Sequence, residues 1–215
     1  MKTIKKDLYD RDFEEYIKTL NYEGKRILDV GCGEGYKTLY FDSSKNELYG
    51  ADLKDRRVEL AKKTINFAIS EQNTIPFADA MFDVVSNFDV IEHALDDALL
   101  IAEIYRVLKK GGVVLTFTPN LNRLSNKITE LVTHKKIRFP RHLGFDEGLE
   151  DCTHQREYSK DTLSALFNTV GFSEIIVENY WFGLRFPVVE QFRIKKNIPH
   201  VLAEYSQYIV AVCTK

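Results

Sequence analysis

The sequence is poor in cysteine and has no long apolar stretch. Its 215 residues include three cysteines, Cys32, Cys152 and Cys213, which are widely separated and form no CxxC pair. An odd number of isolated cysteines excludes a disulfide framework and a cysteine-based zinc site, so we expect reduced thiols. No apolar run approaches the roughly 20 residues that a membrane-spanning helix needs. The first residues also lack the apolar core of a secretory signal, and we therefore expect a cytoplasmic protein.

An excess of charge of either sign is also absent. Thirty Lys and Arg residues balance 32 Asp and Glu residues, which gives a net charge of -2. No overall positive field would hold a nucleic-acid backbone or an anionic membrane, so we predict neither as a partner. An apolar fraction of 44% is enough for an ordinary core. Because there is no internal repeat and no low-complexity linker, we predict one domain over residues 1–215, of unknown oligomeric state.

Helical and extended patterns alternate along the chain, which predicts an open α/β sheet. The predicted helices span residues 12–20, 38–41, 55–63, 95–108, 121–132 and 159–169. The predicted strands span residues 25–30, 47–51, 64–70, 82–86, 113–118, 173–179 and 205–212. We expect Asp55 to cap the helix over 55–63. We also expect residues 109–112, two lysines followed by two glycines, to end the helix over 95–108. The alternation lapses over residues 120–156, which we interpret as an insertion on the substrate side.

Three glycines, Gly31, Gly33 and Gly35, lie where the first predicted strand ends. Without a Cβ, such residues let the backbone bend sharply and approach a ligand closely. Asp52 follows 21 positions after Gly31, at the end of the next strand, where a carboxylate can accept both hydroxyl hydrogens of a ribose. The two features together predict a site for a nucleotide-like cofactor.

The glycine spacing separates two classes of cofactor. The dinucleotide fingerprint is G-x-G-x-x-G/A, but Tyr36 occupies its last position here. The chain reads G-x-G-x-G instead and carries Asp29 just before it. A carboxylate near the turn would repel a phosphate and attract an ammonium group. The pattern favours a cofactor with a ribose, an amino group and no phosphate; an NAD-dependent oxidoreductase is kept as the alternative.

Residues 27–35, Ile-Leu-Asp-Val-Gly-Cys-Gly-Glu-Gly, resemble motif I of the class I S-adenosylmethionine-dependent methyltransferases. Residues 75–77 with 82–85, residues 89–93 and residues 107–113 are similar to later motifs of that family, in the same order. The match covers roughly residues 20–120 and is close to quinone-biosynthesis methyltransferases. The resemblance implies S-adenosyl-L-methionine as cofactor. It also implies a Rossmann-like, doubly wound, seven-stranded mixed sheet with its last strand antiparallel and helices on both faces.

The resemblance also assigns the adenine end of the cofactor. Glu71 stands where the family has an acid that accepts from the adenine amino group, and Leu53 would cover one adenine face. Tyr36 either lines the methionine end or is an ordinary surface ring. Cys32 is simply a small residue in the turn. The complete set of predicted cofactor-binding residues is Asp29, Gly31, Cys32, Gly33, Gly35, Tyr36, Asp52, Leu53, Glu71, Asn87 and Phe88.

Asn87 and Phe88 belong to this set because parallel strands direct their carboxyl ends toward the ligand. Transfer of a methyl group to a hydroxyl also needs an oriented nucleophile and a group that takes its proton. The candidate catalytic residues are His93 and His154, each with a structural hydrogen-bonding role as the alternative. Residues 154–158 resemble a substrate-facing segment of small-molecule methyltransferases, in which Arg156 would contact an anion.

Asp89, Glu92 and His93 are spaced i, i+3 and i+4, so they would share one face if a helix began there. That face could bind a divalent metal. The segment also resembles quinone-biosynthesis O-methyltransferases, in which a cation bridges a catechol. A carboxylate at a helix start has capping as its default role, however, and we predict no metal.

The substrate is indicated by a basic segment. Lys135, Lys136, Arg138 and Arg141 occur without an acid among them, and such a segment suits an anionic substrate. A solvated loop neutralised by the acids of residues 146–151 is the alternative. The aromatic residues 180–182 with Phe186 either roof the pocket or, as we favour, belong to the core.

The predicted function is methyl transfer to a small molecule that is anionic or phenolic, with oxygen as the acceptor atom. Two alternatives stay open at this point. One is a cofactor-binding or scaffold protein without catalysis, and the other is the NAD-dependent oxidoreductase.

Overall fold

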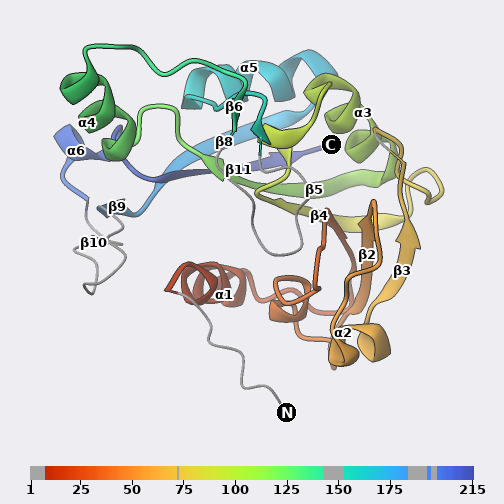
Figure 1. Ribbon diagram of the computed structural model, residues 1–215. Helices are drawn as coiled ribbons and strands as arrows, with labels where there is room; N and C mark the ends of the chain where they lie inside the picture. Colours follow the sequence, from red (N-terminus) through yellow and green to blue (C-terminus); the bar gives the residue numbers. More distant parts are fainter. Residues whose placement is uncertain (1–7, 72, 143–152, 184–192, 195–197) are drawn as a thin grey trace.

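A computed structural model describes residues 8–71, 73–142, 153–183, 193–194 and 198–215. Its main feature is a seven-stranded sheet in the order β3-β2-β1-β4-β5-β11-β8 (Figure 1). The strands are β1 Arg26–Val30, β2 Glu47–Asp52, β3 Asn66–Ile69, β4 Phe82–Phe88, β5 Leu108–Pro119, β8 Ser173–Tyr180 and β11 Tyr208–Thr214. The strands from β3 to β5 are parallel, and β11 is antiparallel to both neighbours. The mixed sheet with an antiparallel last strand is thereby confirmed.

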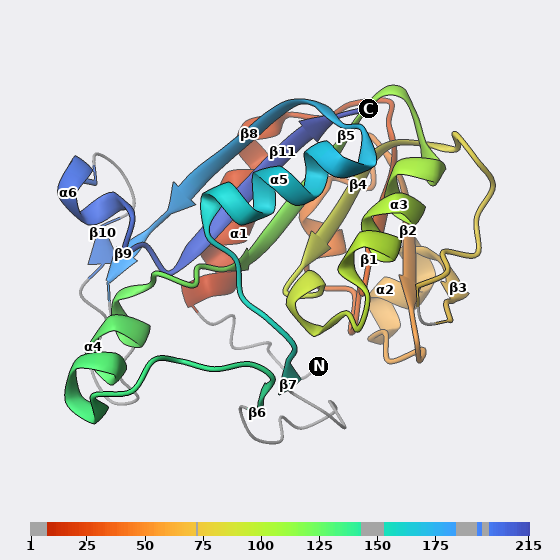
Figure 2. The same ribbon diagram turned by 90° about the horizontal axis from the view of Figure 1, so that it is seen from above.

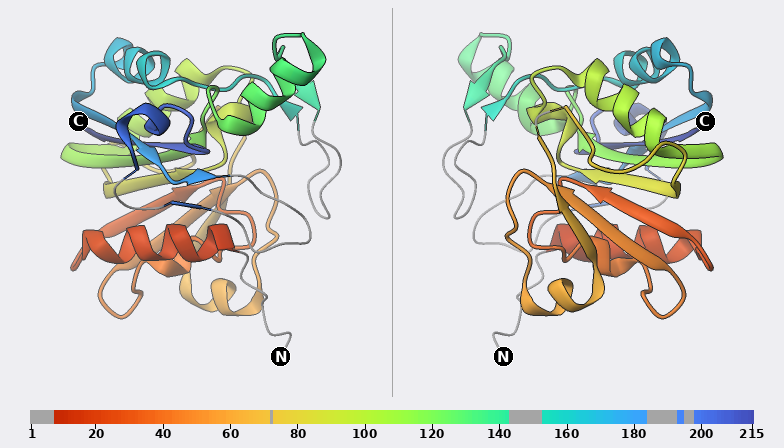
Figure 3. Two further views of the ribbon diagram at one scale, coloured as in Figure 1. Left: turned by 90° about the vertical axis from the view of Figure 1, so that its left-hand side faces the viewer. Right: turned by 90° about the vertical axis from the view of Figure 1, so that its right-hand side faces the viewer.

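Helices cover both faces of this sheet (Figures 1 and 3). On one face lie α1 Leu8–Leu20 and α2 Glu59–Thr64, together with the single turn η1 Thr38–Tyr40. On the other face lie α3 Asp97–Val107 and α5 Lys160–Val170. A second turn, η2 Ile91–His93, follows β4. The three-layer arrangement agrees with the doubly wound fold that the sequence predicts.

The apolar runs of the strands supply both layers of the core. Ile27 packs with α1 and α2, whereas Leu28 packs with α3 and α5. Val84 and Val85 of β4 divide in the same way. Successive side chains of a strand point to opposite faces, so a parallel sheet covered by helices needs a continuous apolar run.

Some predicted helix boundaries are wrong, and two of them involve the predicted capping residues. The predicted helix over 55–63 begins only at Glu59, and its N-cap residue, Val58, makes no side-chain capping hydrogen bond. Asp55 instead accepts hydrogen bonds from the backbone N–H and the guanidinium of Arg57, which form a local turn.

The second error concerns residues 109–112. Helix α3 ends at Val107, and the following Leu108 is already extended and begins β5. Gly111 has a φ of +75°, but it lies within β5 and does not cap the helix.

The insertion begins with α4 Leu124–Thr133, close to the predicted helix (Figure 2). A short hairpin-like pair follows, β6 Arg141–His142 with β7 Thr153–His154. The backbone N–H of Gln155 donates to the carbonyl of Glu92 at 2.7 Å, which fixes β7 beside η2. Residues 143–152 lie outside the described part of the chain, and so do the acids expected to neutralise the basic segment.

The remaining described elements are β9 Phe182–Gly183, β10 Arg193–Ile194 and α6 His200–Ala203. Trp181, just before β9, is 1% exposed and belongs to the core, as the favoured alternative predicts. Phe186 lies outside the described residues. Among the described helices, none is long and apolar enough to cross a membrane.

Candidate active site

A cleft of about 260 Å³ lies at the carboxyl ends of β1, β2, β3 and β4. Each strand contributes residues from its last position or from the loop that follows it. This is the edge where parallel α/β sheets bind ligands, beside the point at which the strand order reverses between β1 and β4. The lining residues are Val30, Gly31, Asp52, Leu53, Arg56, Ser70, Glu71, Asn73, Asp89, Val90, His93, Ala94 and Leu100.

The glycine turn has the conformation that its sequence predicts. Gly31, Gly33 and Gly35 all have positive φ, at +71°, +53° and +84°. A Cβ at Gly31 would overlap the side chain of Val90, and one at Gly35 would lie 2.6 Å from the Cβ of Ala61 in α2. A Cβ at Gly33 would have only the Arg56 guanidinium nearby, at 3.9 Å, so the turn is open to a ligand there.

Asp52 closes the turn from the end of β2. Its Oδ2 accepts the backbone N–H of Gly33 at 2.8 Å, and its Oδ1 accepts that of Lys54 at 3.3 Å. The guanidinium of Arg56, which the sequence analysis missed, lies 3.6 Å from Oδ2. Each carboxylate oxygen retains a second lone pair for a ribose hydroxyl. Leu53 beside it is 58% exposed, which leaves an apolar side chain for a ring to cover.

The cleft therefore brings together Gly31, Asp52, Leu53 and Glu71, four of the predicted cofactor-binding residues. A carboxylate at the ribose position, an exposed leucine and an open glycine turn fit S-adenosylmethionine. Cys32, Gly33, Gly35 and Tyr36 belong to the turn, but they are not among the described residues that line the cleft.

Asp29 lies beneath the turn. It is 1% exposed, and its carboxylate accepts from the hydroxyl of Thr38 at 2.6 Å and from that of Ser86 at 2.9 Å. Burial raises its pKa to about 6. Asp29 thus ties β1 to η1 and β4, and it is not among the described residues that line the cleft; its contact with the cofactor's amino group stays a prediction.

The predicted end of the strand over 82–86 is corrected. β4 continues through Phe88, two residues beyond the predicted end, so Asn87 and Phe88 lie within the sheet and not in the loop after it. The Asn87 amide donates to the Thr116 hydroxyl at 2.7 Å, and the Phe88 ring packs on Phe13 of α1. Their side chains belong to the core.

Cys32 also packs inward. Its Sγ would be 2.8 Å from a Cβ at Gly50, and burial raises the pKa of its thiol. This agrees with a small residue that fills space under the turn.

The predicted helical face of Asp89, Glu92 and His93 does not form. Asp89 has a φ of +56°, and only the single turn η2 follows it. Its carboxylate pairs with the Lys37 ammonium at 2.7 Å. Asp89 lines the cleft together with His93 but is not part of the cluster that Glu92 and His93 form.

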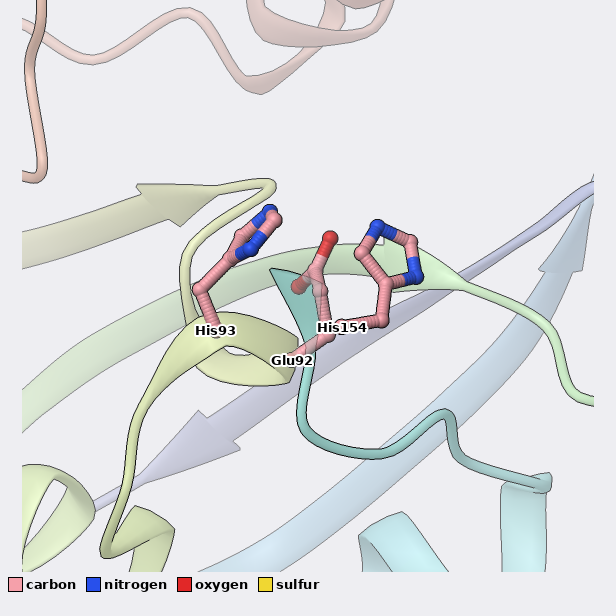
Figure 4. A group of neighbouring side chains, drawn as sticks. All are labelled: Glu92, His93 and His154. Atoms are coloured by element: carbon pink, nitrogen blue, oxygen red, sulfur yellow. The ribbon is translucent and has the colours of Figure 1, made fainter. Parts of the chain in front are cut away.

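Glu92 and His93 meet His154 instead (Figure 4). One possible ligand atom from each residue lies within 4.8 Å of the others. The two imidazoles pack edge to face, with their ring centroids 4.8 Å apart. Glu92 is fully buried; its Oε2 accepts from the Thr118 hydroxyl at 2.9 Å, and its Oε1 has no hydrogen-bond partner among the described residues. Burial, and then the charge of Asp89, raise the pKa of Glu92 to about 8.

Hydrogen bonds orient both imidazoles. The Nδ1 of His93 lies 2.9 Å from the carbonyl oxygen of Thr153, and the Nδ1 of His154 lies 2.9 Å from Oε1 of Glu157. A carbonyl only accepts, and Glu157 is a carboxylate, so each Nδ1 is the donor and Nε2 is the basic nitrogen of the neutral ring. In both predicted catalytic histidines, Nε2 is therefore the ring nitrogen that carries the lone pair.

Glu157 is a residue that the sequence analysis missed. Burial would raise its pKa, but the hydrogen bond from His154 and the charge of Arg123 hold the pKa below its usual value. The Arg123 guanidinium lies 2.6 Å from Oε1, and the Asn126 amide donates to Oε2 at 2.9 Å. An acid three positions after a histidine is the one signal in the sequence that could have indicated this pair.

The predicted anion contacts lie elsewhere. The Arg156 guanidinium donates to the carbonyls of Ala94 and Leu95, both at 2.9 Å, and holds the segment between η2 and α3. Lys135, Lys136 and Arg138 are exposed on the loop after α4 and do not line the cleft.

Comparison with known proteins identifies the family. The family model described as "Methyltransferase domain" matches residues 28–116. A probable S-adenosylmethionine-dependent methyltransferase of Mycolicibacterium smegmatis is 32% identical over 152 residues, covering 69% of this chain and 52% of the relative. A ubiquinone biosynthesis O-methyltransferase of Cereibacter sphaeroides is 32% identical over 121 residues, covering 53% of this chain and 48% of the relative. The chain thus spans about half the length of these relatives.

Solved structures show the same fold. A methyltransferase of Thermotoga maritima, described as a possible histamine N-methyltransferase, aligns with a TM-score of 0.66 and 20% identity, covering 96% of this chain and 89% of that one. A methyltransferase of Methanosarcina mazei aligns with a TM-score of 0.64 and 18% identity, covering 93% and 96% of the two chains. The cleft, the ordered motifs and these relatives agree: the chain belongs to the class I S-adenosylmethionine-dependent methyltransferases.

Proposed function

We propose that this chain transfers the methyl group of S-adenosylmethionine to an oxygen of a small-molecule acceptor. The observation that carries the proposal is that His93 lines the same cleft as Gly31 and Asp52. A proton-accepting side chain thereby stands at one end of the cofactor's predicted site. An acceptor placed between them would meet both the methyl donor and a base.

The chain's own residues would hold the cofactor by three kinds of contact. The carboxylate of Asp52 accepts from the ribose hydroxyls, and the exposed side chain of Leu53 covers an adenine face, with Glu71 near the adenine amino group. The open turn at Gly33 admits the amino-acid end close to the backbone. When bound, the cofactor supplies an electrophilic methyl group.

In the reaction the bond from sulfur to the methyl carbon breaks as the bond from oxygen to that carbon forms. The products are S-adenosylhomocysteine, the methylated acceptor and the proton of the hydroxyl. We assign that proton to Nε2 of His93 or His154, since hydrogen bonds at both Nδ1 atoms leave this nitrogen basic. Glu157 would stabilise the imidazolium of His154, as a carboxylate does for the histidine of a catalytic triad.

One observation supports the acceptor class. Several relatives carry names that specify O-methyl transfer in ubiquinone biosynthesis, which favours oxygen and a phenolic ring. An anionic substituent stays a prediction from the basic segment, because Lys135, Lys136 and Arg138 do not line the cleft.

Cofactor binding is tested by calorimetric titration with S-adenosylhomocysteine, with NADH as the comparison ligand. We expect S-adenosylhomocysteine to bind with a roughly micromolar dissociation constant and NADH to give no signal. Binding of NADH alone would restore the oxidoreductase alternative.

Turnover is tested with S-adenosylmethionine that carries an isotopically labelled methyl group, offered with phenolic and anionic acceptors. Mass spectrometry should find the label on an acceptor oxygen, and a His93→Ala variant should lose most of the rate while it still binds S-adenosylhomocysteine. Tight cofactor binding without turnover on any acceptor would favour a cofactor-binding protein that lacks catalysis.

A further inference from the structure

Three electron-pair donors converge beside the cofactor cleft. They are a carboxylate oxygen of Glu92 and a ring nitrogen from each of His93 and His154, and one such atom per residue lies within 4.8 Å of the others. Figure 4 shows the Glu92 carboxylate between the two imidazoles. The residues come from η2 and β7, which are far apart in the sequence and held together by the backbone bond from Gln155 to Glu92. The fold itself therefore assembles this convergence.

The convergence suits a positive partner once Glu92 is ionised. The hydrogen bonds at Nδ1 make each Nε2 an acceptor, and a carboxylate oxygen is an acceptor as well. Glu92 is fully buried and its Oε1 has no hydrogen-bond partner in the described part of the chain, although burying a polar atom in that state is costly. A cation at this point would give Oε1 of Glu92 a partner and would be coordinated by the two imidazoles.

We propose that Glu92, His93 and His154 form a binding site for a divalent transition-metal cation of the Zn²⁺ type. Two imidazoles and one carboxylate suit Zn²⁺, Fe²⁺ or Co²⁺, whereas Mg²⁺ and Ca²⁺ prefer oxygen ligands. The set differs from the one that the spacing of Asp89, Glu92 and His93 suggests, because the structure pairs Asp89 with Lys37 and brings in His154.

The surroundings of the cluster match those of metal ligands in general. Ligating histidines usually donate their other ring N–H to a carbonyl or a carboxylate. Here the carbonyl of Thr153 serves His93, and Glu157, held by Arg123, serves His154. His93 lines the cleft, which provides a route from solvent to the buried atoms.

The donor atoms have to move closer together to share one ion. At bond lengths of about 2.0–2.2 Å, the ligands of a tetrahedral ion lie about 3.3–3.6 Å apart. The donor atoms of the cluster lie within 4.8 Å of one another, so side-chain rotations that move them by roughly 1 Å would bring them to one ion. A cation bound there would lower the pKa of a hydroxyl that it coordinates.

The metal site goes beyond the proposed methyl transfer; it shares His93 with the cofactor cleft but does not involve Asp52 or the glycine turn. A histidine cannot act as a proton acceptor and as a metal ligand at the same time, because an Nε2 that coordinates an ion has no lone pair for a proton. Binding is therefore measured directly, without recourse to turnover.

The experiment uses the full chain after treatment with a chelator. Calorimetric titration with Zn²⁺ should show one site per chain, and Co²⁺ should give the visible absorption of a histidine-ligated ion. Glu92→Gln and His154→Asn should each weaken Zn²⁺ binding by about 100-fold or more, since even residues behind the ligands change affinity 10- to 100-fold. His200→Ala, on exposed α6, is the matched control and should leave the affinity unchanged.

Asp89→Asn tests whether Asp89 is a ligand, as the spacing of Asp89, Glu92 and His93 suggests. Because the proposed site does not include Asp89, this variant should change the Zn²⁺ affinity less than tenfold. Each variant is checked by circular dichroism and by its binding of S-adenosylhomocysteine. A folded chain that binds S-adenosylhomocysteine but no Zn²⁺ would overturn the metal site and leave the proposed function standing. Equal Zn²⁺ affinity in the wild type and in His154→Asn would overturn it as well.

Discussion

Four buried carboxyl groups near the ends of strands have different partners, and the partners decide what each can do. Asp29 accepts from two hydroxyls inside the sheet, and Asp52 accepts from the backbone of the glycine turn at the edge of the cleft. Glu157 is surrounded by donors and stays ionised, whereas Glu92 has an oxygen without a partner among the described residues. The residue type alone therefore does not separate structure from function here.

Asp52→Asn should weaken the binding of S-adenosylhomocysteine about tenfold, or by about 1.4 kcal/mol. The amide would lose one of the two acceptor oxygens that serve the ribose and the Gly33 N–H. Calorimetry measures the affinity, with Glu47→Gln, at the opposite end of the same strand, as the control. An unchanged affinity in Asp52→Asn would remove Asp52 from the cofactor site.

Asp29→Asn should change how stability depends on pH. Burial raises the folded-state pKa of Asp29 from 3.8 to about 6. A carboxyl whose folded pKa is raised favours folding at low pH, and this contribution disappears as the pH rises from about 4 to about 6. Two pKa units correspond to about 3 kcal/mol.

Between pH 4 and pH 7, the free energy of unfolding of the wild type should therefore fall by up to about 3 kcal/mol relative to that of Asp29→Asn. Urea unfolding at several pH values measures it. A constant difference across that range would show that Asp29 titrates normally.

At the scale of elements, the ends of helices depend on a few local contacts. Ser159 precedes α5 and forms a reciprocal capping box with Thr162, whose backbone N–H donates to the serine hydroxyl while its own hydroxyl accepts the serine N–H. Ser159→Ala should lower the free energy of unfolding by about 1 kcal/mol. Ser164→Ala, inside the same helix, should change it by less than about 0.5 kcal/mol. Equal losses in urea unfolding would contradict the cap.

The sequence predicted element types better than element ends. Apolar periodicity is enough to place every strand of the main sheet, because each strand must fill two layers of core. It does not locate the end of β4, since Asn87 and Phe88 are buried by neighbours that are distant in the sequence, Thr116 and Phe13. Similarly, nothing local indicates that Asp55 would bond to Arg57 instead of capping α2.

At the scale of the whole molecule, the two halves of the site differ in how they form. The cofactor half comes from consecutive strand ends, so motifs within a short stretch predict Gly31, Asp52 and Glu71. The histidine half needs β7 to return to η2 across the insertion, a contact that no local pattern specifies. The sequence predicts His93 and His154 as separate candidate catalytic residues. Only the fold shows that they share one cluster with Glu92.

Because the cofactor cleft joins the ends of four strands, a ligand there should stabilise the whole chain. At a concentration of 100 times its dissociation constant, S-adenosylhomocysteine should raise the free energy of unfolding by about 2.7 kcal/mol. For a chain of this length that corresponds to a rise in Tm of about 5–10 °C in differential scanning calorimetry.

The same concentration should stabilise Asp52→Asn by only about 1.4 kcal/mol, since a tenfold weaker affinity leaves the ligand at about ten times the dissociation constant. The ratio of the two shifts thus reports the contribution of Asp52 without any knowledge of the acceptor. Equal shifts in both proteins would mean that the ligand binds somewhere other than the end of β2. A shift in the wild type that Asp52→Asn halves would tie the global stability of the sheet to the carboxylate at its ligand-binding edge.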